Sequence, residues 1–198
     1  MTIQSVGQSV PRVDALGKVK GEALYSGDLS MPGMLYMKIL FAERAFARVK
    51  SIDTSKAEAA PGVAAVYTAK DVPVNEYGLQ IPDQPVLCGP GAAKPYTDLV
   101  RFVGDQVAVV VAETEAQAAA AVKLIEVEYE DLPPLLDPIE AMQPGAPLLH
   151  PDRGSDNICV HYRIRKGDID EGFKQADLID ESEYRTPVQE HAYLQPAA

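Results

Sequence analysis

The stretch YRTPVQEHAYLQPAA, residues 184–198, gathers the side chains whose types are best suited to chemistry. Gln189, Glu190 and His191 could hydrogen-bond a ligand or another subunit, and Glu190 with His191 could serve a small hydrolase or isomerase. Such a pair needs a third group to orient it, and none stands nearby in the sequence. The same three side chains could simply close a strand. Spacing alone therefore assigns no catalytic residue to this segment.

The histidines and cysteines do not form a recognisable metal or redox motif. His150, His161 and His191 show neither i, i+4 helical spacing nor an HExxH companion, so a metal site made by this chain alone is not predicted. Cys88 and Cys159 lie far apart and outside any CxxC pattern. Two thiols cannot hold an iron–sulfur cluster that needs four. Their sparse use indicates a reduced, cytoplasmic setting rather than a disulfide framework.

Other catalytic and nucleotide-binding motifs are missing. The sequence contains neither GxxxxGK[ST] nor GxSxG. GPGAAK, residues 89–94, superficially suggests a dinucleotide loop, but a proline separates its glycines and no strand–helix frame surrounds it, so we interpret it as a turn. The many Asp and Glu residues fall on alternating solvent faces, which indicates a solvated surface. We assign no catalytic, cofactor-binding or metal-binding residue.

Composition restricts the partners that the chain could have. Its 198 residues, 46% hydrophobic and 24% charged, indicate a globular protein of one large domain, or one domain and a fragment. A formal net charge of -11 disfavours nucleic acid and anionic membranes as partners. No apolar run approaches about 18 residues. The N-terminus lacks a basic start and an apolar signal core, so we expect a cytoplasmic protein.

Short elements are predicted for the first half of the chain. The first 20 or so residues are polar and broken by glycine and proline, which indicates an extended lead-in. Residues 35–41 are predicted to form a strand entered through the Pro32-Gly33 turn. Residues 48–73 read as strand, short helix, strand, with Asp53 or Thr54 as the helix cap. Residues 75–98, rich in proline and glycine, are predicted to be a long surface loop.

The clearest unit runs from residue 101 to residue 138. Residues 107–112 form a continuous apolar run, typical of a strand buried on both faces. Thr114 with Gln117 forms a capping-box pattern before an alanine-rich helix that reaches Leu124. Residues 125–130 then alternate between apolar and acidic, which predicts a strand with one buried face. Two prolines stop it.

The composition changes after residue 135. Residues 136–154 form a proline- and glycine-rich linker, and residues from about 155 onward read as strand, turn, short helix and strand, with Asp168 as the helix cap and Glu171 completing its capping box. This last piece is too small to bury a core of its own, so it needs something else to pack on. The residues alone therefore predict an α+β domain followed by a fragment that requires a partner.

Seven pieces of the sequence, in the same order, resemble one family. RVDALGKVKGEALYSGD, residues 12–28, resembles the opening of the molybdenum-binding large subunit of the xanthine dehydrogenase/aldehyde oxidase family, with Lys20 in place of the usual threonine. PGMLY, PGVAAVYTAKDVP, RFVGDQVAVVVAET and IEVEYEDLPPLLDP follow. KGDIDEGFKQAD and YRTPVQEHAYLQP resemble the stretch leading into the molybdopterin-binding domain, with Gln195 where glutamate is usual. FAERAFAR departs from the family's usual histidine-containing run.

The resemblance implies an α+β fold in three parts. Residues 1–135 would form an α/β-hammerhead domain with an extended N-terminal lead-in, residues 136–154 a linker, and residues 155–198 the incomplete start of a molybdopterin-binding domain. The chain would thus stop inside a domain. The family's decisive cofactor loops and its glutamate base have no counterpart in this sequence.

The resemblance also implies an activity for the complete enzyme, which would be an oxidoreductase acting by oxidative hydroxylation. A molybdopterin-type molybdenum cofactor would be bound by the complete enzyme rather than by this chain alone, with iron–sulfur clusters and FAD on partner subunits or domains in a hetero-oligomer. This chain would support the cofactor domain without a catalytic residue of its own. The alternative is a free-standing hammerhead-type binding or scaffold module without catalysis.

Overall fold

The structure is a computed structural model that describes residues 6–79 and 81–192. The chain divides into two units, which are considered separately. One is the continuous stretch Gly33–Ile164; the other combines the N-terminal segment up to Pro32 with the C-terminal segment from Arg165. Both sheets and every core residue belong to the stretch Gly33–Ile164 in the described part of the chain. No helix among the described residues is long and apolar enough to cross a membrane.

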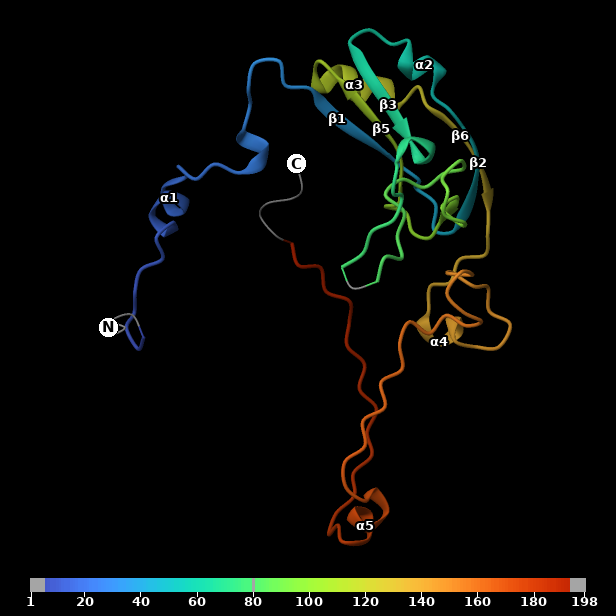
Figure 1. Ribbon diagram of the computed structural model, residues 1–198. Helices are drawn as coiled ribbons and strands as arrows, with labels where there is room; N and C mark the ends of the chain where they lie inside the picture. Colours follow the sequence, from blue (N-terminus) through green and yellow to red (C-terminus); the bar gives the residue numbers. More distant parts are fainter. Residues whose placement is uncertain (1–5, 80, 193–198) are drawn as a thin grey trace. The chain divides into compact units, whose positions relative to one another are not determined.

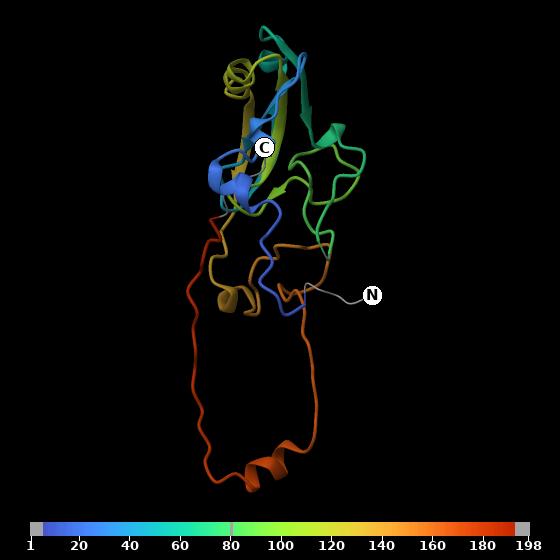
Figure 2. The ribbon, with the colours of Figure 1, turned by 90° about the vertical axis from the view of Figure 1, so that its left-hand side faces the viewer.

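The first sheet is antiparallel and has the order β1-β5-β3 (Figure 1). Its strands are β1 (Tyr36–Phe41), β5 (Gln106–Ala112) and β3 (Val63–Thr68). The two helices α2 (Ser55–Glu58) and α3 (Glu115–Val122) pack on one face, where Ala57 and Ala121 meet Ala108 and Val110. Figure 2 shows α3 beside this sheet. Small alanine side chains let the helices approach the strand closely, and the predicted strands and helices here are confirmed.

One face of the central strand is less covered than its sequence predicts. Ala108, Val110 and Ala112 are fully buried beneath the helices, whereas on the opposite face Val107 is buried but Val109 and Val111 are only partly buried. The prediction of burial on both faces is therefore confirmed in full for one face and only at Val107 for the second. The continuous apolar run could not reveal this, because periodicity does not say whether a second layer is present.

Helix α3 begins where the sequence predicted. The hydroxyl of Thr114 accepts a hydrogen bond from the N–H of Gln117 at 3.2 Å and donates to the Gln117 side chain at 2.8 Å. Just before helix α2, the carboxylate of Asp53 accepts from the N–H of Ser55 at 2.9 Å. These bonds satisfy N–H groups that the first helical turn leaves unpaired.

The second sheet has the order β4-β2-β6, with both pairings antiparallel. Its strands are β4 (Leu99–Val100), β2 (Ala47–Asp53) and β6 (Glu126–Asp131). The alternation predicted for the last strand is confirmed: Val127 and Tyr129 pack against the core while Glu126, Glu128 and Glu130 face outward. These carboxylates bond to side chains on or beside β2, namely Lys56, Ser51 and Lys50.

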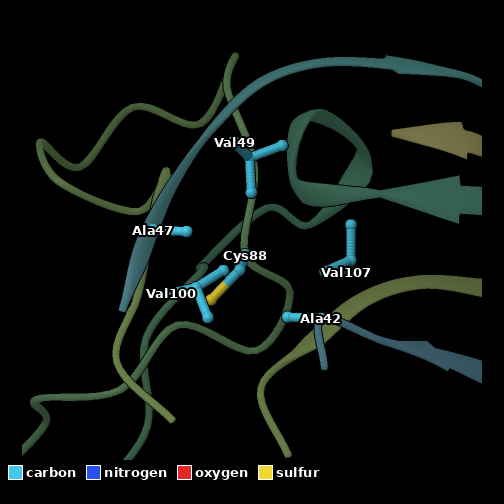
Figure 3. Close-up of a cluster of buried hydrophobic side chains, with 6 residues drawn as sticks. All are labelled: Ala42, Ala47, Val49, Cys88, Val100 and Val107. Carbon is cyan, nitrogen blue, oxygen red and sulfur yellow. The ribbon is translucent and has the colours of Figure 1, made fainter. Parts of the chain in front are cut away.

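A compact cluster of buried side chains joins this sheet to the long loop. Figure 3 shows Cys88 among Ala42, Ala47, Val49, Val100 and Val107. The sulfur thus lies among aliphatic side chains from β2, β4 and β5. One short 3₁₀ turn and one short helix complete the described elements of this unit. The turn η2 (Ala69–Asp71) follows β3, and helix α4 (Pro138–Ala141), capped by Asp137, lies in the linker of residues 136–154, also called the connector below.

The N-terminal segment contains a helix where we predicted an extended lead-in. Helix α1 (Ala15–Lys20) is followed by the 3₁₀ turn η1 (Ser26–Asp28). Asp14 forms ion pairs with Arg12 at 2.5 Å and Lys18 at 2.7 Å, and Gly21 ends the helix in the left-handed region at φ +73°. Alanine, leucine and lysine favour a helix, and the Asp14–Lys18 pair supports it, although glycine and proline flank the segment. No residue of either element is buried.

The C-terminal segment contains the predicted helix but not the predicted strands. Helix α5 (Ile169–Lys174) starts at Asp168, whose carboxylate accepts from the N–H of Glu171 at 3.0 Å. No described residue beyond residue 131 belongs to a strand. A strand exists only when a neighbour accepts its hydrogen bonds, and the two segments that flank α5 have no such neighbour in the described part of the chain.

Candidate functional site

Arg101, which directly follows β4, joins main-chain groups from two parts of the sequence. Its Nε donates to the carbonyl oxygen of Leu149 at 2.6 Å, and Nη1 donates to that of Leu99 at 3.2 Å. Nη2 reaches the carbonyl oxygen of Tyr96 at 3.5 Å. The guanidinium therefore fastens the connector to the end of β4. Burial lowers the pKa of Arg101, an effect that nearby groups, Asp105 among them, oppose.

Asp105 closes the turn that follows Arg101. Its carboxylate accepts from the N–H of Arg101 at 2.6 Å and from the N–H of Phe102 at 3.2 Å. The adjacent Cys88 thiol donates to the carbonyl oxygen of Leu99 at 3.6 Å. Burial, reinforced by Asp105, raises the pKa of Cys88 far above its usual range. Cys88 is therefore a protonated, structural thiol and not a nucleophile.

A cavity of about 250 Å³ lies beside the Arg101 contacts. It is lined by Ile81, Asp83, Leu149, His150, Arg153, Asp156, Asn157, Ile158 and Cys159. Its walls come from the long loop and the connector, which are far apart in the sequence. The wall carries both acidic and basic groups beside apolar side chains, so it has no single charge preference.

Several polar groups in this wall are already engaged by the fold. Asn157 donates to the carbonyl oxygens of Ala141 and Pro147, and accepts from the N–H of Leu149, each at 2.9 Å. Arg153 donates to the carbonyl oxygen of Pro82. Asn157 holds the connector together and Arg153 holds it against the long loop, so the first role of both groups is structural.

His150 is the one sequence-selected histidine that lines this cavity. Burial, with the charge of Arg101 as the next cause, lowers the pKa of His150. The imidazole is therefore neutral at pH 7. His161 and His191 are exposed, and no group of three or more His, Cys, Asp or Glu side chains among the described residues could hold a metal ion.

The other sequence-selected residues are not brought into one site. Cys88 is buried and Cys159 is exposed, and both thiols are unpaired. The segment Gly89–Lys94 is a turn closed by Thr97, whose hydroxyl donates to the carbonyl oxygen of Gly89 at 3.2 Å. The C-terminal trio makes local contacts: the Glu190 carboxylate accepts from the N–H of His191 at 3.0 Å, and the Gln189 amide donates to the Glu190 carbonyl oxygen.

Sequence reasoning did not single out Arg101 or Asn157. Each acts through main-chain carbonyl groups, which leave no pattern of side-chain types in a sequence. The one available signal was the Arg101–Asp105 spacing at the start of a buried strand. What the arrangement does chemically is to fix a loop and a connector. It places no nucleophile, acid or base against a substrate position.

Comparison with known proteins identifies the fold's family. The family model described as the aldehyde oxidase and xanthine dehydrogenase a/b hammerhead domain matches residues 20–133. The chain is 46% identical over 185 residues to a probable xanthine dehydrogenase subunit of Bacillus subtilis (strain 168), a match that covers 93% of this chain and 23% of that protein. It is 35% identical to the nicotinate dehydrogenase large molybdopterin subunit of Eubacterium barkeri, covering 98% of this chain and 44% of that subunit.

Solved structures agree with these sequence matches. The aldehyde oxidoreductase of Desulfovibrio gigas superposes with a TM-score of 0.69 at 32% identity, over 85% of this chain and 19% of that one. The chain thus spans from about a quarter to less than half of the length of the two relatives compared above. Taken with the two sheets and the helices that cover one of them, these matches show that the chain belongs to the aldehyde oxidase/xanthine dehydrogenase family and contains its hammerhead domain.

Proposed function

We propose that this chain is the N-terminal part of the large subunit of a molybdenum hydroxylase of the xanthine dehydrogenase/aldehyde oxidase type. One observation carries this proposal: similarity to such subunits continues past the hammerhead match into residues whose apolar side chains remain exposed. Tyr162, Leu178 and Tyr184 are each at least 80% exposed. Side chains of this size gain about 1.5–3 kcal/mol each when buried, so their exposure indicates a missing neighbour.

Three functional parts follow from this proposal. Residues 1–135 form the hammerhead domain with its lead-in, residues 136–154 the linker, and residues 155–198 the start of the molybdopterin-binding domain. The linker's contact with Arg101 supports a fixed attachment to the hammerhead domain, because the guanidinium donates to the carbonyl oxygen of Leu149 in the linker. The chain would serve as a structural base for the cofactor domain.

The described residues do not by themselves fit a molybdenum cofactor. They bring no three metal-ligating side chains together, and Arg101 and Asn157 already bond to main-chain carbonyl oxygens. We therefore derive no catalytic step for this chain and assign it no catalytic, cofactor-binding or metal-binding residue. The cofactor, the iron–sulfur clusters and FAD would be held by the remaining parts of a cytoplasmic hetero-oligomer. The two unpaired thiols support a reduced compartment.

Native purification from the host would test this proposal. An affinity tag at the N-terminus would recover the tagged polypeptide with its companions, and native mass spectrometry and elemental analysis would follow. We expect molybdenum and iron at a fixed ratio to the tagged polypeptide, whether the rest of the large subunit is joined to it or forms a separate chain.

A stable, metal-free protein that carries only these 198 residues would contradict the enzyme proposal. It would favour the free-standing binding or scaffold module instead. Lys123→Glu, a change at an exposed position in the hammerhead domain, gives a matched preparation with an altered surface and an unaltered core. Its metal content should equal that of the unmodified chain.

A further inference from the structure

The segment Ile158–Ile164, which we call the exit segment, has the side-chain pattern of a strand. Ile158, Val160, Tyr162 and Ile164 alternate with Cys159, His161 and Arg163. In an extended chain this period of two places the four apolar side chains on one face and the polar ones on the other. Isoleucine, valine and tyrosine are also favoured in strands. The exit segment therefore carries a complete strand pattern but belongs to no sheet in the described part of the chain.

The exit segment is attached to the fold at one end and loses its contacts along its length. The exposed fraction rises from 46% at Ile158 and 54% at Val160 to 80% at Tyr162 and 91% at Ile164. Its start is held where Asn157 bonds to Ala141, Pro147 and Leu149. A segment that is anchored at its start and then exposes its apolar side chains is expected of a strand whose pairing neighbour lies outside the described residues.

The backbone N–H groups of the exit segment also need a neighbour that can accept their hydrogen bonds. Within the described part of the chain, the N–H groups from Cys159 to Ile164 donate no hydrogen bond. A neighbouring strand would satisfy these groups and cover the apolar face in one step, which an apolar surface alone would not do. Strand pairing is therefore the mode of association that the segment fits.

The charged side chains of the exit segment indicate which side chains the neighbouring strand should carry. Arg163 forms no ion pair among the described residues, and His161 lies on the same polar face. Facing carboxylates would stabilise a cross-strand pair at these positions, whereas facing lysine or arginine would oppose it. The match with the Eubacterium barkeri subunit covers 98% of this chain but 44% of that subunit, so relatives that carry this segment also carry a large amount of sequence outside the match.

We propose that the exit segment joins a β-sheet of the molybdopterin-binding remainder as an added strand, next to an edge strand that presents apolar side chains on one face and carboxylates opposite His161 and Arg163. This inference rests on the proposed function and specifies how the two parts are joined. The hammerhead domain would then be linked to the rest of the enzyme by a continuous hydrogen-bonded ladder rather than by a loose tether.

Hydrogen–deuterium exchange would test this inference. The natively purified enzyme is compared with the 198-residue chain produced alone. We expect amides 159–164 to exchange rapidly in the chain alone and at least about tenfold more slowly in the enzyme. Tyr162→Pro, which removes one N–H group and opposes pairing, should lower recovery of the molybdenum-containing enzyme at least about tenfold.

Two control variants separate strand pairing from general damage. Ser155→Pro introduces the same residue into an exposed bend before the exit segment and should leave recovery unchanged. Arg163→Glu should lower recovery about threefold or more, whereas Lys123→Glu, with the same change in net charge, should not. The inference would be overturned if Ser155→Pro lowered recovery of the enzyme as much as Tyr162→Pro does. It would also be overturned if Lys123→Glu lowered recovery as much as Arg163→Glu does.

The possible results also distinguish this inference from the proposed function. If the enzyme is recovered with molybdenum but amides 159–164 exchange as fast as in the chain alone, strand addition is wrong while the proposed function stands. If these amides are already slow in the chain alone, the pairing strand lies within this chain and the inference again fails. If no molybdenum-containing enzyme is recovered from the unmodified host, the proposed function fails and removes the basis of the inference.

Discussion

Arg101 contributes to stability through three main-chain acceptors, on Leu149, Leu99 and Tyr96. We expect Arg101→Ala to lower the free energy of unfolding by about 1–3 kcal/mol, because the partly buried carbonyl oxygens of Leu149 and Leu99 lose their donor. Arg101→Lys should recover only part of this loss, since an ammonium group cannot reach acceptors in several directions at once. Urea unfolding followed by circular dichroism would measure both changes.

The exposed Lys123 provides the control for this substitution. Lys123→Ala should change the free energy of unfolding by no more than about 0.5 kcal/mol. A loss for Arg101→Ala as small as that of the control would mean that the carbonyl contacts contribute nothing measurable.

The buried thiol of Cys88 should make stability depend on pH in the alkaline range. Its pKa in the folded chain is raised by burial, whereas in the unfolded chain a thiol ionises near pH 8.5. Above that pH the unfolded chain loses a proton that the folded chain keeps. Stability should therefore be complete below about pH 8.5 and fall as pH rises, by up to about 1.4 kcal/mol per pH unit.

Urea unfolding at about pH 7.5 and about pH 9.5, roughly one unit below and one unit above the usual thiol pKa, would measure this dependence. Cys88→Ala should be less stable at the lower pH because it leaves a small cavity, but its stability should depend less on pH. Cys159→Ala should retain the full dependence, since that thiol is exposed. An unchanged slope in Cys88→Ala would assign the effect to another group.

At the level of elements, the two sheet-associated ion pairs of β2 differ in burial and should differ in energy. Arg48 pairs with Asp98 where both side chains are partly covered. Lys50 Nζ lies 2.8 Å from a carboxylate oxygen of Glu130, and both of these side chains are half-exposed. We expect Arg48→Ala to cost about 1–2 kcal/mol of unfolding free energy and Lys50→Ala less than about 0.5 kcal/mol. Double-mutant cycles with Asp98→Ala and Glu130→Ala would isolate each pair.

Salt offers a second measurement of the same difference. Raising the salt concentration to about 1 M shortens the screening length to about 3 Å and should weaken the Lys50–Glu130 coupling more than the Arg48–Asp98 coupling. Equal coupling energies, or equal salt dependence, would contradict the assignment of these pairs to different environments.

The sequence predicted those elements whose causes are local. Thr114 and Gln117 start α3 through neighbouring groups, and the alternation of residues 125–130 is satisfied by one packed face. The prediction failed where the cause was remote. The half-open face of β5 depends on which layers are present, and the expected strands beside α5 depend on a pairing neighbour. The Arg101 contacts could not be predicted because their acceptors are main-chain atoms brought together by folding.

For the molecule as a whole, the two units should differ in resistance to proteolysis. The stretch Gly33–Ile164 contains the buried clusters, whereas helices α1 and α5 have no buried residue. Brief digestion with trypsin should cut first at exposed basic residues such as Lys18, Lys20, Arg165 and Lys166, and leave a resistant hammerhead fragment. Intact-mass measurement would identify its ends.

Digestion of the natively purified enzyme provides the comparison. If the chain is part of a large subunit, as proposed, sites around residues 163–166 should become slower to cut in the enzyme than in the chain alone. Early cutting within β2, β5 or β6 in the chain alone would contradict the view that the hammerhead domain has its own stable core.

The different burial of the two thiols has a practical consequence. Cys88 lies among aliphatic side chains, while Cys159 is exposed on the polar side of the exit segment, at the point where anchoring by Asn157 ends. A maleimide fluorophore or nitroxide would therefore attach to one defined position without any engineered cysteine. The spectrum of that probe would report on the junction between the hammerhead domain and whatever follows it, so that any association at this junction gives an optical or magnetic-resonance signal that can be followed in real time.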